Sequence, residues 1–301
     1  MVDYVTHSLF GSLAGQSVTG RKMRRRAALV AGVSAFVPDL DLLAPWFFDP
    51  LSALLLHRHF THSLFLAPVI GITVAVFVMA LDRRLRFAHW KMTCVAGVLG
   101  AATHGFLDVC TSYGTLWLWP FSNNRPAWNI ISYFDIFLLF FTLVAVLLSV
   151  TIFKSRRYFP IIVLLVGIAY LSVGWVQNLR ATDTQKAIAH ARGHVVEKGK
   201  IIPNLLGLSE WRSLYISNGI VYADYIKTPF NDESCYWSGI RKKSYDLQEF
   251  QRESAPSSDV LEDFEAFNRF SEGFLFKISE NPLRVGDMRF ILEPKSCKRS
   301  A

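Results

Sequence analysis

Glutamate is absent from residues 1–196, and the first one in the chain is Glu197. Charged residues of every kind are scarce, at 19% of the 301 residues, whereas soluble domains carry about 25%. Four cysteines are too few for a small disulfide-stapled scaffold, and an aromatic content of 14% excludes a disordered chain. A sequence that is 51% hydrophobic and poor in charge is instead typical of a protein with a membrane-embedded part.

The two parts of the chain differ in composition. Residues 1–178 contain 14 Lys and Arg, 7 Asp and no Glu, whereas residues 179–301 contain 18 Lys and Arg and 17 Asp and Glu. The second part therefore has the composition of an ordinary soluble domain. We expect residues 1–178 to form a membrane-embedded domain and residues 179–301 to form a separate soluble domain.

Several apolar stretches approach the length of a membrane span, which is about 20 residues for ~30 Å of hydrocarbon. Four of them have no internal Lys or Arg, namely Ala27–Phe48, Leu64–Leu81, Met92–Val109 and Ile130–Phe153. A fifth, Pro160–Val176, is shorter, and Tyr4–Thr19 can span, pack against other helices or lie at the interface. The predicted fold is an all-α polytopic membrane domain of about 5–6 helices, followed by a small soluble α+β domain.

Basic residues alternate with the apolar stretches. Three basic clusters occupy residues 21–26, 83–91 and 154–157, whereas the connections 49–63 and 110–129 contain one arginine each, Arg58 and Arg125. Such clusters also occur in solvated loops and in nucleic-acid-binding segments, but their alternation with apolar spans favours the positive-inside rule. We therefore expect a multi-pass membrane protein without a nucleic-acid partner, whose two connections and soluble domain lie on the outer side.

Ionisable side chains of the apolar part gather at one predicted depth. An Asp near the centre of a spanning helix costs roughly 2.5–3.5 kcal/mol, so such residues imply a partner or a ligand. Threading the spans by the charge rule brings to their outer ends Asp39, Asp41, His57, His59, His62, His104, Asp108 and Asp135, joined by His7 if Tyr4–Thr19 spans. Scattered structural histidines have no reason to share one membrane face.

Each of these motifs also has a simpler structural interpretation. His104 and Asp108 are four residues apart, so they share one helix face and can form a hydrogen-bonded couple. Asp39 and Asp41 can cap a helix-breaking turn, and residues 57–63 can form an amphipathic interfacial loop.

Taken together, these imidazoles and carboxylates favour a site for divalent metal ions. Nitrogen and oxygen ligands without thiolates suit zinc or manganese, and suit iron less well. A number of ligands above four indicates a catalytic centre of two or three ions. The expected ligands are Asp39, Asp41, His62, His104 and Asp108, followed by His7, His57 and Asp135. Asp39 or Asp135 is the expected general base, and Arg58 is placed either to hold a phosphate or to snorkel at the interface.

At these residues the chain resembles the YdjM-like (YbcI-like) inner-membrane metal-dependent hydrolases of bacteria. The resemblance covers residues 1–178 and rests on Thr6-His7-Ser8, Pro38-Asp39-Leu40-Asp41, His57-Arg58, Thr61-His62-Ser63, His104-Gly105-x-x-Asp108-x-x-Thr111-x-x-Gly114, Pro120-Phe121-Ser122 and Asp135. It implies a hydrolase of the inner membrane whose site faces the periplasm under the charge rule. The chain departs from the family pattern at His59, where Gly is usual, and at Ile136, where Pro is common.

A fainter similarity is to the zinc-dependent phospholipase C fold and its nuclease relatives. In that fold an early His, an Asp, a His and a His-x-x-x-Asp/Glu pair gather a metal cluster. The order here is parallel: His7, Asp41, His57 or His62, His104, Asp108. The later His-x-x-x-Glu pair of that fold has no counterpart in this sequence, so the similarity implies phosphoester hydrolysis by analogy.

Residues 179–301 lack long apolar runs and predict a small α+β domain. Helical patterns cover Ala181–Val196 and Ser257–Glu272, and strand patterns cover Trp211–Ser217, Ile220–Ile226, Phe274–Ile278 and Met288–Leu292. Asn218-Gly219 between the first two strands is a hairpin signature. Cys235 and Cys297 can pair in an oxidising compartment. We expect this domain to pack or to bind substrate rather than to catalyse a reaction on its own.

The sequence thus predicts a membrane-bound metal-dependent hydrolase with a lipid or lipid-linked substrate. A site at headgroup depth favours such a substrate, and membrane lipids are the expected partners. Two alternatives stay open: a metal-ion transporter or sensor, and a structural membrane protein whose polar cluster ties helices together. Transport sites lie near the bilayer midplane, whereas these residues lie at one edge, which disfavours transport.

Overall fold

The computed structural model describes residues 3–19, 23–153, 158–205, 208–291 and 298–299. The chain forms two compact units, Met1–Gly174 and Trp175–Ala301. We refer to them as the helical unit and the sheet unit. Each is considered by itself below, and helix α8 contributes residues to both.

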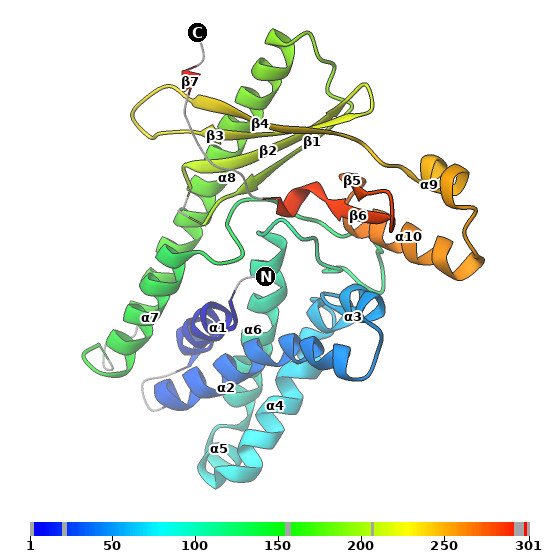
Figure 1. Ribbon diagram of the computed structural model, residues 1–301. Helices are drawn as coiled ribbons and strands as arrows, with labels where there is room; N and C mark the ends of the chain where they lie inside the picture. Colours follow the sequence, from blue (N-terminus) through cyan, green and yellow to red (C-terminus); the bar gives the residue numbers. More distant parts are fainter. Residues whose placement is uncertain (1–2, 20–22, 154–157, 206–207, 292–297, 300–301) are drawn as a thin grey trace. The chain divides into compact units, whose positions relative to one another are not determined.

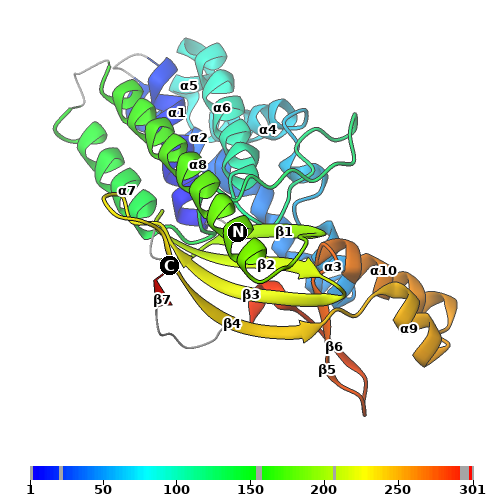
Figure 2. The same ribbon diagram turned by 90° about the horizontal axis from the view of Figure 1, so that it is seen from above.

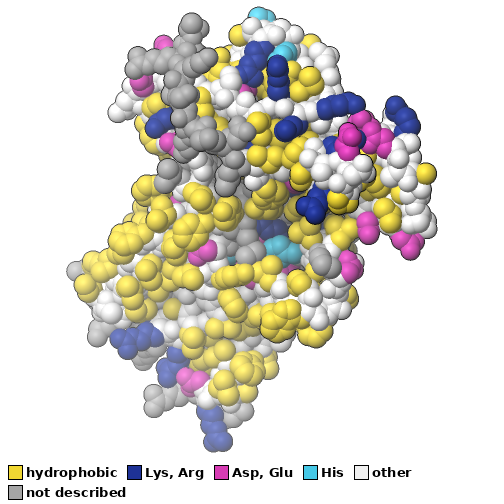
Figure 3. Space-filling model, in the orientation of Figure 1, with side chains coloured by type: hydrophobic (Ala, Val, Ile, Leu, Met, Phe, Trp, Pro, Cys, Tyr) yellow, Lys and Arg dark blue, Asp and Glu magenta, His cyan; other side chains and the backbone are white. Residues whose placement is uncertain are grey.

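The helical unit consists of short and long helices joined by irregular loops (Figure 1). In chain order they are α1 (Tyr4–Val18), α2 (Arg24–Phe36), the 3-10 helix η2 (Val37–Trp46), α3 (Pro50–Leu56), the 3-10 helix η3 (Phe60–His62), α4 (Ala67–Leu81), α5 (Arg83–Ala88), α6 (Trp90–Val109), α7 (Ile136–Val150) and α8 (Phe159–Ala191). Figure 3 shows hydrophobic side chains over most of the visible face of this unit, as expected for a surface in contact with lipid.

Three of the described helical segments are long and apolar enough to cross a membrane: Arg24–Trp46, Trp90–Val109 and Phe159–Ala191. A fourth span is formed if Leu51–His62 and Ala67–Leu81, which are bent by 81°, count as one. The helical character predicted for this part is therefore confirmed, with three to four candidate spans among the described residues. The stretch Ile130–Phe153 yields a helix of 15 residues, because Asp135 caps it at Ile136.

Glycines allow the helices of this unit to approach one another closely. A Cβ atom at Gly100 of α6 would lie 2.1 Å from the carbonyl oxygen of Ala31 of α2. A Cβ atom at Gly71 of α4 would lie 2.3 Å from the backbone nitrogen of Val98 of α6. Small residues at helix crossings are the usual means of packing helices in a membrane, where apolar burial gives little driving force.

The sheet unit is built on a five-stranded sheet in the order β1-β2-β3-β4-β7, with every neighbouring pair antiparallel. Its strands are β1 (Lys198–Pro203), β2 (Glu210–Ser217), β3 (Ile220–Lys227), β4 (Cys235–Lys243) and β7 (Lys298–Arg299). Helices α9 (Leu247–Ser254) and α10 (Ser258–Phe270) lead to the hairpin of β5 (Leu275–Ser279) and β6 (Arg284–Asp287). Figure 2 shows β1 to β4 side by side in chain order.

Hydrophobic clusters hold the sheet unit together, and two of them include strands of the main sheet. On α8, Ala181 and Ile188 pack with Trp211 and Ile226 of the sheet. A second cluster contains Leu214, Val221, Ala223, Phe274, Phe276 and Met288, so the β5–β6 hairpin and the main sheet share apolar side chains. The amide of Gln185 on α8 donates to Ser213 Oγ and to the carbonyl oxygen of Leu214, at 2.8 and 2.9 Å.

The sequence patterns of this part are matched with two differences. The hairpin is present, with Asn218 at φ 50° and Gly219 at φ 68°, the left-handed values that a tight turn of this kind needs. Pro160–Val176 and the first part of the predicted helix Ala181–Val196 belong to one continuous helix, α8, because no proline or glycine interrupts residues 177–191; the helix ends at Ala191, five residues before the predicted end. The predicted strand Met288–Leu292 is wrong: Met288–Phe290 is a 3-10 turn capped by the Asp287 carboxylate. Cys297 lies outside the described residues.

The glycine crossings predict that Gly100→Val destabilises the helical unit by roughly 1–3 kcal/mol, since the added carbons would meet backbone atoms of Ala31 that cannot move aside. Gly167→Ala is the milder control, because its Cβ would meet the end of the Phe10 ring at 3.2 Å. Thermal unfolding in detergent measures both. Equal melting temperatures for Gly100→Val and the control would show that the crossing tolerates a side chain.

Candidate functional site

Five segments of the helical unit bring their polar side chains together. His7 comes from α1, Asp39 and Asp41 from η2, His57 and Arg58 from the end of α3, His62 from η3, and His104 and Asp108 from α6. His7, His104 and Asp108 have no exposed surface, His62 is 2% exposed and Asp39 is 3% exposed. Asp41 and His57 are half-buried. Of the eight predicted metal ligands, all except Asp135 are therefore part of one cluster.

Local structure explains how the two α6 residues and the η2 residues reach the same point. His104 and Asp108 are one turn apart, so both project from the same face of α6. Pro38 at the start of η2 cannot donate a backbone hydrogen bond, and there the α-helix gives way to a tighter 3-10 helix. This change of helix type turns Asp39 inward and leaves Leu40 exposed.

Imidazole Nε2 atoms and carboxylate oxygens face one another at the centre of the cluster. His62 Nε2 lies 3.3 Å from Asp108 Oδ2 and 3.5 Å from Asp39 Oδ1. His104 Nε2 lies 3.5 Å from Asp108 Oδ2 and 3.6 Å from Asp39 Oδ1. His7 Nε2 lies 3.4 Å from Asp108 Oδ1.

Apart from Asp108 Oδ1, which forms an ion pair with Arg58, these central atoms have no hydrogen-bond partner among the described residues. Buried polar atoms are normally paired, because leaving one unpaired costs about 1–3 kcal/mol. Two ligands that each lie about 2.1 Å from a tetrahedral zinc ion are about 3.4 Å apart. The spacing of the central atoms therefore fits ligands that share an ion better than it fits direct hydrogen bonds.

The outer atoms of these side chains are held by neighbouring groups. His104 Nδ1 lies 2.6 Å from the carbonyl oxygen of Ala35, so it donates there and leaves Nε2 with its lone pair. Asp41 Oδ1 is 2.7 Å from His57 Nδ1, and Asp41 Oδ2 accepts from Thr61 Oγ1 at 3.0 Å. Such outer contacts fix the orientation of a ligand before an ion arrives.

Three overlapping groups of these residues have the spacing of a metal site, with ligand atoms within 4.8 Å of one another. The first contains His7, Asp39 and His104, the second contains His62, His104 and Asp108, and the third contains Asp39, Asp41, His57 and His62. His104 and His62 are each shared by two groups, and so is Asp39.

Arg58 is buried beside Asp108. Its Nη2 lies 2.8 Å from Asp108 Oδ1 and its Nη1 donates to Thr111 Oγ1 at 2.8 Å. The guanidinium also lies over the ring of Tyr113, 5.2 Å from the centroid. At 2% exposure, Arg58 is positioned to compensate the Asp108 charge and to fix its direction.

Asp135 and His59 lie outside the three groups. Asp135 caps α7, where Oδ1 accepts from the Leu138 backbone nitrogen at 2.9 Å and Oδ2 accepts from Tyr170 Oη at 2.8 Å. His59 instead contacts the rings of Phe60 and Trp119.

Sequence reasoning did not identify the residues that support the cluster. The Thr61 hydroxyl donates to Asp41 and the Thr111 hydroxyl accepts from Arg58, and the Ala35 contribution is a backbone carbonyl that no side-chain pattern can reveal. The position of Thr111 in the sequence is a partial indication of its role. It follows Asp108 by three residues, and its hydroxyl donates to the Asp108 backbone carbonyl.

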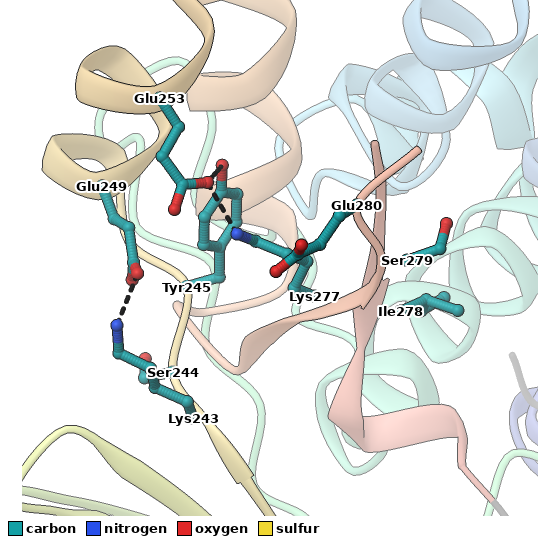
Figure 4. Close-up of a pocket in the computed structure, with 9 residues that line it drawn as sticks. All are labelled: Lys243, Ser244, Tyr245, Glu249, Glu253, Lys277, Ile278, Ser279 and Glu280. Atoms are coloured by element: carbon teal, nitrogen blue, oxygen red, sulfur yellow. Dashed lines mark hydrogen bonds and ion pairs between the residues drawn. The ribbon is translucent and has the colours of Figure 1, made fainter. Parts of the chain in front are cut away.

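The sheet unit contains a cleft of about 420 Å³ in which Lys243, Glu249, Glu253 and Lys277 are paired (Figure 4). Lys243 Nζ donates to Glu249 Oε1 at 2.5 Å, and Glu253 Oε2 accepts from Lys277 at 2.6 Å and from Tyr245 at 3.1 Å. The hydrogen bond from Lys277 lowers the pKa of Glu253, and the same contact raises the pKa of Lys277. This mutual pairing gives the cleft a structural role.

The Arg58–Asp108 pair predicts a large effect of Arg58→Leu on stability. Removing one partner of a buried ion pair costs about 3–5 kcal/mol, because the other charge is left uncompensated. Arg26→Leu is the control, since its ion pair with Asp82 is about one third exposed and such pairs contribute about 0–1 kcal/mol. Thermal unfolding in the presence of a chelator is the measurement, and Arg58→Leu combined with Asp108→Asn is expected to recover part of the loss. A loss equal to that of Arg26→Leu would contradict the assigned pairing.

Comparison with known proteins gives a consistent result. A family model described as YdjM inner membrane protein matches residues 1–181. The chain is also 28% identical over 135 residues to inner membrane protein YbcI of Escherichia coli (strain K12), an alignment that covers 44% of this chain and 76% of that protein. No solved structure matches the chain. The match covers every residue of the buried cluster, and the chain belongs to the YdjM inner membrane protein family.

Proposed function

We propose that the protein is a metal-dependent hydrolase of the inner membrane that cleaves a phosphoester of a lipid or lipid-linked substrate. The observation that carries this proposal is the set of buried Nε2 and carboxylate oxygen atoms that face one another without hydrogen-bond partners among the described residues. Zinc is the ion that the nitrogen and oxygen ligands suit best, and manganese is the alternative.

The sharing of ligands favours two ions over three. One imidazole nitrogen binds one ion, so the group of His62, His104 and Asp108 competes for nitrogens with both other groups. The group of His7, Asp39 and His104 and the group of Asp39, Asp41, His57 and His62 have no histidine in common. These two groups can be filled together, with Asp39 shared between them.

When bound, the ions would lower the pKa of a water molecule and polarise the scissile phosphoester. Asp39 is the proposed general base: its Oδ1 faces His62 and His104, which leaves Oδ2 to take a proton from the attacking water. Asp135 is a weaker candidate, because both of its oxygens already accept hydrogen bonds. Arg58 holds Asp108 in place, and Asp41 holds His57.

Exposed aromatic side chains beside the cluster support a lipid substrate. Trp46 ends η2, which carries two of the carboxylates, and Phe47 and Phe48 follow it; the three are 81%, 77% and 54% exposed. Phe121, in another loop of the same unit, is 77% exposed. Aromatic residues of this kind gather at the membrane–water interface, so the site would open at headgroup depth.

Contacts among the basic clusters support a periplasmic site. Arg26 at the start of α2 pairs with Asp82 after α4, and Arg24 donates to the carbonyl oxygen of Phe153 after α7. Arg24 and Arg26, the start of α5 after Asp82, and Phe153 at the end of the described segment after α7 thus belong to one end of the helical unit. The ligands are at the other ends of their helices, in η2 after α2 and in the last two turns of α6. Under the positive-inside rule the basic end is cytoplasmic.

The two-ion proposal predicts about two zinc ions per chain in the purified protein, as measured by elemental analysis. A His104→Ala/Asp108→Ala variant is expected to lose at least one of them, because it removes ligands from two of the three groups. His190→Ala, which changes an exposed histidine of α8, is the control and is expected to keep both. Unaltered metal content in the double variant would remove these two residues from the site, and a metal-free wild type with normal folding would favour a structural role.

Hydrolysis and transport are separated in one preparation of proteoliposomes containing phosphatidic acid and zinc. We expect phosphate release that depends on added metal and falls at least about 100-fold in His62→Ala, together with no zinc flux above that of empty vesicles. Zinc uptake that His62→Ala abolishes, without release of phosphate, would instead establish the transporter alternative.

A further inference from the structure

A second feature of the helical unit is an apolar groove between α7 and α8, with a volume of about 550 Å³. Its walls include Phe137, Phe140 and Val144 of α7, and Val163 and Val166 of α8. Phe140 is 68% exposed and Val166 is 48% exposed, so the groove opens on the outside of the unit. In a membrane this outside is hydrocarbon.

The side chains of the groove do not suit another transmembrane helix as its occupant. Where helices of this unit cross, Gly71 and Gly100 let the backbones touch. The groove is lined instead by bulky residues, including Phe140 and Phe141, which would hold a second helix at a distance. Helix association in lipid depends on small residues and close backbone contact. A flexible hydrocarbon chain fits such a groove better than a helix does.

One end of the groove is polar and lies level with the buried cluster. At this end Tyr170 donates to Asp135 at 2.8 Å. Helices α1 and α8 run in opposite directions, since Phe10 lies beside Gly167, and Leu13, three residues further along α1, shares a hydrophobic cluster with Val163, four residues earlier on α8. His7 is one turn before Phe10, so it lies at the level of Tyr170 along the helix axis.

We propose that the α7–α8 groove binds one hydrocarbon chain of the lipid substrate, with the headgroup at the Tyr170 end. This inference rests on the proposed function and adds to it the place where the substrate is held. Binding a chain outside the ligand cluster would let the protein select lipids over soluble phosphoesters, because a soluble ester gains nothing from the groove.

The test uses the full chain in lipid nanodiscs with a phosphatidic acid that carries a photoactivatable diazirine on one acyl chain. Val144→Trp fills the groove from α7 and Val166→Trp fills it from α8. Leu147→Trp is the matched control, since Leu147 lies one turn from Val144, is 54% exposed and does not line the groove. Turnover is measured in parallel on long-chain phosphatidic acid and on its dibutanoyl form, and metal content reports on folding.

We expect crosslinks of the wild type to map to α7 and α8. Both groove variants should lower the crosslink yield and the kcat/KM for the long-chain lipid by about tenfold, with dibutanoyl turnover and metal content unchanged. Crosslinks that the groove variants leave at the level of Leu147→Trp would overturn the groove while the proposed function stands. Wild-type protein that crosslinks in the groove but hydrolyses neither lipid would overturn the proposed function, and with it the substrate role of the bound chain.

Discussion

A carboxylate removed from water must be compensated, and this requirement at Asp108 organises the helical unit. Its Oδ1 is met by the Arg58 guanidinium at 2.8 Å and by His7 at 3.4 Å, and its Oδ2 by His62 and His104 at 3.3 and 3.5 Å. One side chain of α6 thus gathers groups from α1, from the end of α3 and from η3. In a unit made largely of apolar helices, few other interactions are strong enough and specific enough to fix such distant segments to one point.

This convergence depends on how closely the helices approach. The contact of Gly100 with Ala31 brings α6 against α2, and the contact of Gly71 with Val98 brings α4 against α6. Helix α1 also approaches α6, since a Cβ atom at Gly11 would lie 3.4 Å from the Cα atom of Gly100, and the imidazoles of His7 and His104 stack at 3.9 Å between ring centroids. The glycines at the helix crossings therefore allow the ionisable side chains of the cluster to come into contact.

The sequence carried much of this arrangement because its strongest signals are local. The spacing of His104 and Asp108 on one helix face and the Asn218-Gly219 turn each involve only a few neighbouring residues, and the alternation of basic clusters with apolar stretches can be read directly along the chain. Long-range details were less accessible. Arg58 was weighed as a phosphate-binding or an interfacial residue, whereas its guanidinium lies against Asp108, fifty residues further along the chain. The predicted strand at Met288 failed because Asp287 bonds its own backbone neighbour, a competition that apolar patterning does not register.

Arg58 has one further consequence. Its backbone adopts the left-handed region, at φ 60°, which brings its amide to within 3.3 Å of Asp41 Oδ2 while its side chain reaches Asp108. A single residue therefore touches both carboxylates on opposite sides of the cluster. Neutralising the Asp41 or the Asp108 carboxylate changes the electric field at Arg58 and the position of Arg58, which contacts the other carboxylate. The effect of each carboxylate on the other is equal by thermodynamic necessity. In the metal site that we propose, a change at Asp41 would therefore also be felt at Asp108 through Arg58.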